Sequence, residues 1–144
     1  MRTIELVERM RAVNKALITR LAPLAQEQGL TIPEVTVLWK VHNAGAYRVT
    51  ALAEHLGLAP STLTGLLDRL TARGLLERDA DPEDRRAVVM KCTDALRDLM
   101  RHLMRAGSKH LEKAFRRLSP ELIERLTADL AAVQRSLEEE GTEE

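Results

Sequence analysis

The chain has 144 residues, in which 22 lysines and arginines balance 22 aspartates and glutamates. This length supports one core of useful size but is short for two, and a net charge of zero provides no overall basic field to indicate nucleic-acid binding. A lone cysteine excludes an internal disulfide, and because the N-terminal segment is charged and no long apolar run follows, we expect no signal peptide, no membrane span and a cytoplasmic location.

The first predicted element is a helix near the N-terminus with a narrow apolar seam. Its apolar residues follow intervals of three and four, with Asn14 in the gap, at Val7, Met10, Leu17, Leu21 and Leu24. A seam this narrow favours packing against a partner helix. Pro23 lacks a backbone donor, so the helix is expected to kink or restart there.

The second helix is predicted from the signals at its start. Thr31 and Glu34 have the spacing of a capping box, and Leu30 and Val35 are placed as a hydrophobic staple. The helix is therefore expected to begin just after Thr31 and to end before Gly45. A very short strand at Tyr47–Val49 and a third helix, capped by Thr50 and running through Leu56 to a turn at Gly57, are expected to follow.

The segment that begins at Pro60 has the pattern of an amphipathic helix. Its apolar positions recur at helical spacing, at Leu63, Leu66, Leu67 and Leu70. Pro60 is expected at the first helical position after Ala59, a poor cap, and Gly74 is expected to end the helix in a left-handed conformation. This helix and the preceding one are predicted to form a helix-turn-helix pair.

A hairpin with a basic tip is predicted after that helix. Residues 75–77 lead into an acidic turn at residues 79–84, and residues 87–92 return as a short apolar strand. Arg85 and Arg86 stand where the chain turns back. Cys92 shares a strand face with Val88 and Met90, which favours a small core residue over a redox sensor.

Two further helices are predicted after Thr93. The inward positions of the first are Leu96, Leu99, Leu103, Leu111, Ala114 and Leu118. Ser119 and Pro120 start the next helix, whose seam comprises Ile123, Leu126, Leu130, Val133 and Leu137. Seams at both chain ends exceed what one small core needs, so we expect these helices to pack between two subunits; an intramolecular helix pair is the alternative.

Three short motifs occur at a consistent spacing. They are T-L-T-G at Thr62–Gly65, L-D-R-L-T-A-R-G-L-L at Leu67–Leu76, and D-R-R at Asp84–Arg86 followed by Thr93. In this combination the chain resembles the MarR family (multiple antibiotic resistance regulators) of transcription factors. The resemblance implies a homodimeric DNA-binding regulator, with repression relieved by a small aromatic or phenolic anion.

The expected fold is mainly α with a small β-hairpin wing, a winged helix-turn-helix flanked by N- and C-terminal dimerisation helices. Residues 1–144 are expected to form a single domain. Residues 31–92 would form the DNA-binding lobe, residues 1–29 and 93–138 the dimerisation helices, and residues 139–144 an acidic tail.

Double-stranded DNA with a pseudo-palindromic operator is the expected partner, because a helix of this width fits the major groove. The candidate contacts are Pro60, Ser61, Thr62, Thr64, Gly65, Asp68, Arg69, Arg73, Asp84, Arg85 and Arg86. The helix start, which lacks a good cap, leaves amides for a phosphate. By resemblance, Asp84 holds Arg86 and the shape of the wing, and Arg85 enters a minor groove.

An effector site is predicted at Asn14, Trp39 and His42, with a core role as the alternative for Trp39. No phosphate-binding loop, nucleophile elbow or metalloprotease motif occurs, so no enzyme activity, catalytic residue, cofactor or metal site is expected. A winged-helix module that binds protein, or a metal- or redox-responsive regulator, are the alternatives. The basic hairpin tip would be superfluous in a module that binds protein.

Overall fold

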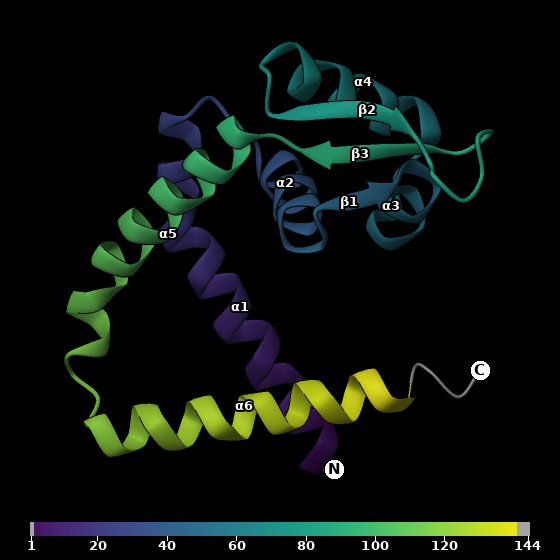
Figure 1. Cartoon of the computed structure of the whole chain (residues 1–144). Helices are drawn as coiled ribbons and strands as arrows, with labels where there is room; N and C mark the ends of the chain where they lie inside the picture. The colour runs from purple at the N-terminus through teal and green to yellow at the C-terminus, as the bar shows by residue number, and fades with distance from the viewer. Residues whose placement is uncertain (1, 141–144) are drawn as a thin grey trace. The chain divides into compact units, whose positions relative to one another are not determined.

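The computed structural model describes residues 2–140, which form two compact units, residues 2–110 and residues 111–140. The elements are α1 (Arg2–Glu27), α2 (Ile32–Ala44), β1 (Ala46–Arg48), α3 (Val49–Leu56), α4 (Pro60–Ala72), β2 (Leu76–Ala80), β3 (Val88–Cys92), α5 (Asp94–Phe115) and α6 (Pro120–Glu140) (Figure 1). The division between the units falls within α5. Among the described helices, none is long and apolar enough to cross a membrane.

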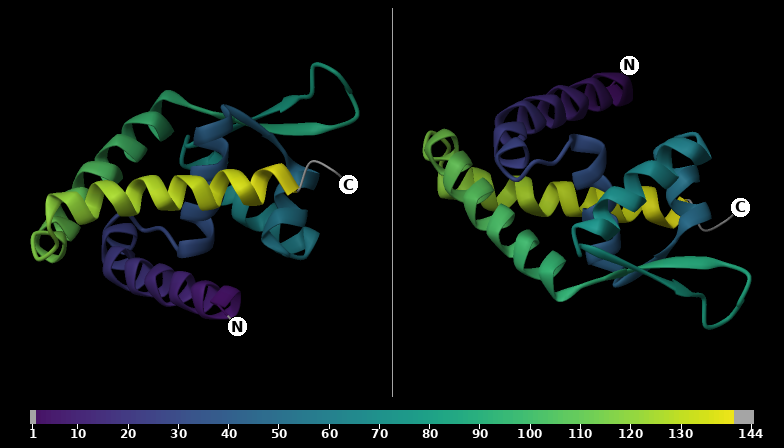
Figure 2. Two further views of the ribbon diagram at one scale, coloured as in Figure 1. Left: turned by 90° about the horizontal axis from the view of Figure 1, so that it is seen from below. Right: turned by 90° about the horizontal axis from the view of Figure 1, so that it is seen from above.

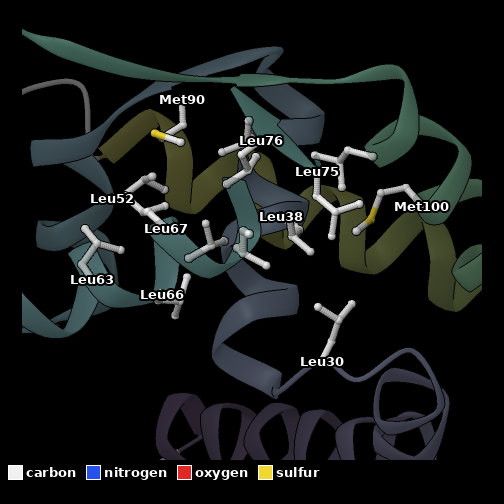
Figure 3. Packing of buried hydrophobic residues seen from close by; sticks show 14 of the residues in the cluster. Leu30, Leu38, Leu52, Leu63, Leu66, Leu67, Leu75, Leu76, Met90 and Met100 are labelled. Carbon is white, nitrogen blue, oxygen red and sulfur yellow. The ribbon is translucent and has the colours of Figure 1, made fainter. Parts of the chain in front are cut away.

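The core of the first unit is mainly aliphatic, and in it α4 packs against α2, α3 and the sheet (Figure 3). All four predicted apolar positions of α4 are buried, together with Leu38 of α2, Leu52 of α3 and Met90 of β3. Each such side chain stabilises the fold by about 1.5–3 kcal/mol relative to an exposed one. The opposite, polar face of α4 is therefore held at the surface.

The sheet is antiparallel, with the strand order β1-β3-β2. Its first strand begins at Ala46, one residue before the predicted start, and Tyr47 pairs with Met90. The second strand continues to Ala80, so the prediction that Asp79 lies in the turn is wrong. Asp79 is instead paired with Val89 across the ladder, and the pairing continues toward the tip as far as Ala80 and Val88. The Asp79 carboxylate lies 2.5 Å from Nζ of Lys91, a diagonal neighbour on β3.

The signals around α2 and α4 are confirmed. Thr31 and Glu34 form both bonds of the capping box, and Gly74 adopts a left-handed conformation, with φ of 73°, after α4. The prediction that Thr50 caps α3 is wrong, because Arg48 occupies the N-cap position and forms no side-chain cap. Arg48 is the last residue of β1, and its backbone is extended, with ψ of 136°, as an N-cap residue requires. The helix therefore begins directly after the strand, at Val49.

Helix α1 is continuous from Arg2 to Glu27, so the predicted restart at Pro23 does not occur. Because Pro23 has no N–H, the carbonyl of Thr19 lacks its usual donor within the helix. Both residues are exposed, so water can donate to that carbonyl instead. The C-terminal half of α1 packs within the chain: a Cβ on Gly107 of α5 would lie 3.4 Å from Leu21 Cδ2. Part of the predicted seam therefore finds its partner helix in the same chain.

The cap of α6 is confirmed, since Ser119 Oγ accepts a hydrogen bond of 3.2 Å from the N–H of Leu122. The helix continues through Glu139 to Glu140, so the first two residues of the predicted acidic tail belong to it. Negative charge does not stop a helix, because glutamate is a good helix former. The rest of the predicted tail, residues 141–144, lies outside the described residues.

Candidate nucleic-acid interface

The start of α4 presents polar groups without a side-chain cap. Ala59 is the N-cap, Pro60 follows at the first position, and no side chain bonds the free amides. Ser61 and Thr62 are exposed beside them, and Thr64 Oγ1 donates to the carbonyl of Pro60 at 2.8 Å. A helix N-terminus with unpaired N–H groups and the positive end of the helix dipole attracts an anion such as a DNA phosphate.

The two central charged residues of α4 are each paired with a residue outside the helix. Asp68 forms an ion pair with Arg78 of β2. Arg69 donates through Nε to Glu34 Oε1 of α2 at 3.3 Å. Asp68 and Arg69 were predicted from the sequence but their partners were not, because a partner on another element has no local spacing signal.

The C-terminal end of α4 is bonded to both neighbouring segments. Arg73, predicted as a DNA contact, donates to the carbonyls of Gln28 at 2.7 Å and Gly29 at 3.2 Å, in the loop after α1. Thr93, just before α5, donates through Oγ1 to the carbonyl of Gly74 at 2.7 Å. These bonds give Arg73 an intramolecular role and link the orientation of α4 to the adjoining parts of α1 and α5.

The base of the wing is held by a buried carboxylate. Asp81 is 7% exposed and forms an ion pair with Arg48 of β1. Its Oδ1 also accepts the N–H of Glu83 at 2.9 Å, and these hydrogen bonds, the backbone one first, lower the pKa of the Asp81 carboxyl. This pair, which was not predicted from the sequence, ties the hairpin loop to the edge strand β1.

The tip of the wing projects beyond α3 and α4 (Figures 1 and 2). Asp84 Oδ1 accepts the N–H of Arg86 at 3.1 Å and lies 3.5 Å from Arg86 Nε, as the resemblance implied. Arg85 is exposed and forms no ion pair within residues 2–140. The arginine with the free charge is therefore the one expected to enter the groove.

The predicted effector residues lie partly at the surface. Trp39 is 43% exposed, which rules out a core role, and its ring centroid lies 6.2 Å from that of His42. Asn14 is exposed on α1. The aromatic pair offers a face for a planar ligand, but its use by an effector stays a prediction.

Cys92 is partly buried against the core, as expected for a small apolar residue. Burial raises the pKa of its thiol, so the unreactive protonated form predominates at neutral pH. Its Sγ lies 3.9 Å from His42 Nδ1. Across the described part of the chain, no group of three or more His, Cys, Asp or Glu side chains is placed to hold a metal ion.

Two packed helices with an exposed second helix, followed by a hairpin with a basic tip, define the winged helix-turn-helix class. The model of the MarR family matches residues 30–88. The chain is 35% identical over 109 residues to the HTH-type transcriptional regulator YfiV of Bacillus subtilis, covering 76% of this chain and 68% of that protein. The chain belongs to the MarR family and is a DNA-binding transcriptional regulator, not an enzyme.

Solved structures agree with this assignment. The transcriptional regulator Tm0710 from Thermotoga maritima has a TM-score of 0.75 and 25% identity, with both chains covered completely. A mutant of MarR from E. coli, complexed with operator DNA, has a TM-score of 0.67 and 23% identity over 92% of this chain and 95% of that one. The predicted fold is confirmed by these structures.

Proposed function

We propose that two copies of the chain form a homodimer that represses transcription from a pseudo-palindromic operator. One observation carries the dimer: large apolar side chains remain exposed on the terminal helices. They are Ile4, Leu6, Val7, Val13 and Ile18 of α1 and Ile123, Leu126, Leu130 and Leu137 of α6. An exposed apolar face on a helix is unfavourable in water, and on each of these helices it favours burial against a symmetry-related copy.

The site geometry supports a division of roles on DNA. The amides and hydroxyls at the start of α4 suit phosphate contacts, and the central exposed face of α4 suits base edges in the major groove. Arg85 at the wing tip suits a narrow minor groove, while Asp84 and Arg86 maintain the loop. Repression follows from occupancy, because a dimer that covers both half-sites excludes other proteins from the same DNA.

Selection of bound sequences from random DNA, at a stated salt concentration, tests this function. The expected product is an inverted repeat whose half-sites are centred about one helical turn, roughly 34 Å, apart, because two symmetry-related α4 helices must enter successive major grooves. Enrichment of unrelated single sites would contradict the symmetric dimer. A pool with no enrichment at all would favour a winged-helix module that binds protein.

A small aromatic carboxylate or phenol is expected to lower the affinity for the operator. A ligand can do so only to the extent that it prefers a spacing of the two α4 helices that does not fit DNA. Salicylate serves as the probe, and the release of operator DNA is measured as its concentration rises. The variant that combines Trp39→Ala with His42→Ala should release DNA only at a higher salicylate concentration than the parent does. If this folded variant binds DNA normally and releases it at the parent's salicylate concentration, the proposed effector site is wrong.

A further inference from the structure

Glu34 is a buried carboxylate with two separate partners. It is 6% exposed at the start of α2, where its Oε2 accepts the N–H of Thr31 at 3.1 Å and completes the capping box. The cap does not use Oε1, which accepts from Arg69 Nε of α4 at 3.3 Å. A single side chain therefore caps α2 and also holds an arginine on the exposed face of α4.

The contact occupies only one of the three nitrogens of the Arg69 guanidinium. Nε faces Glu34, and Nη1 lies 3.8 Å from the position that a Cβ on Gly65 would take. The Arg69 side chain is still 64% exposed. The two terminal nitrogens are thus left for another acceptor on the exposed face of α4, while the bond to Nε restrains the plane of the group.

We propose that Glu34 is a positioning residue that directs Arg69 to a guanine in the operator, an inference that rests on the proposed placement of α4 in the major groove. Guanine presents O6 and N7 as two acceptors that match the terminal nitrogens of arginine. Holding the fork before DNA arrives also reduces the side-chain freedom lost on binding.

The same ion pair disfavours a phosphate role for Arg69. The carboxylate of Glu34 offsets the charge that would attract a phosphate, whereas directional hydrogen bonds to a base edge remain available. Glu34 itself is too buried to contact DNA. Its effect on binding is therefore expected to depend on the base that Arg69 faces.

The substitution Glu34→Gln separates the two functions of this side chain. Glutamine keeps an oxygen for the N–H of Thr31, since capping boxes accept either residue, but it removes the charge that holds Arg69. Affinities are measured at fixed salt for the selected operator, for operators with each base changed in turn, and for non-specific DNA.

The parent is expected to prefer one guanine per half-site by about 10-fold or more. Arg69→Ala should abolish that preference, and Glu34→Gln should remove most of it, while binding to non-specific DNA and its salt dependence stay unchanged. The variant that combines Glu34→Gln with Arg69→Ala should show the same base preferences as Arg69→Ala alone. Thr31→Ala, which weakens the cap but leaves the ion pair, should keep the guanine preference.

The proposal is overturned if Glu34→Gln retains the parent's preference at that base, or if it weakens binding equally for every base. The proposal is also overturned if the parent binds its operator specifically and Arg69→Ala leaves every base preference unchanged. A parent that enriches no DNA sequence would instead overturn the proposed function, and this inference with it.

Discussion

Replacing Leu126 and Leu130 of α6 by aspartate should convert the protein to a monomer and lower operator affinity by about 10²–10⁴-fold. The two leucines are 46% and 48% exposed and lie one turn apart on the apolar face of α6. In the proposed dimer they are buried, and burial of an unpaired carboxylate in an apolar interface is strongly unfavourable. Each released subunit would then bind one half-site alone.

Sedimentation equilibrium at micromolar concentration measures the assembly, and titration of labelled operator measures the affinity. Ala128→Asp combined with Ala132→Asp is the matched control, since it places the same charges four residues apart on the opposite face of α6. The control should remain a dimer with parental affinity. If the leucine variant stays dimeric, or if the parent is already a monomer, α6 does not form the proposed interface.

Replacing Arg85 by alanine should lower the affinity for the operator by about 30-fold or more, on the basis of roughly 1 kcal/mol per half-site in a dimer. The physical reason is the loss of a guanidinium from a narrow minor groove, whose negative potential is strongest in A·T-rich DNA. The preference for A·T flanks should decrease together with the affinity. Competition between operators with A·T and G·C flanks measures both effects.

Arg85→Lys provides the comparison that separates charge from shape. Lysine keeps the positive charge, so the dependence of affinity on salt should stay close to that of the parent. Alanine should reduce that dependence, because one counterion-releasing contact per half-site is lost. Equal affinity and equal flank preference in parent and Arg85→Ala would show that the wing tip does not enter the groove.

The sequence was sufficient for the order of the elements and for the family. Signals such as the capping box at Thr31 and Glu34, the left-handed Gly74 and the Ser119 cap each involve residues within a few positions of one another. Local rules of this kind can be recognised without knowing how the helices pack. At the start of α3 the local rule favoured Thr50 as the N-cap residue. The strand that precedes the helix instead placed Arg48 at that position.

Only the tertiary structure decided which charged side chains hold one another. Arg69 is 35 residues from Glu34, and Arg48 is 33 residues from Asp81. Arg73 donates to the carbonyl of Gln28, which is 45 residues earlier in the chain, before α2 and α3. Such pairs leave no periodic signal, because their spacing depends on how whole elements pack against the core. The sequence by itself therefore determined which residues α4 exposes, whereas packing determined which of them are already restrained by the protein and which remain free.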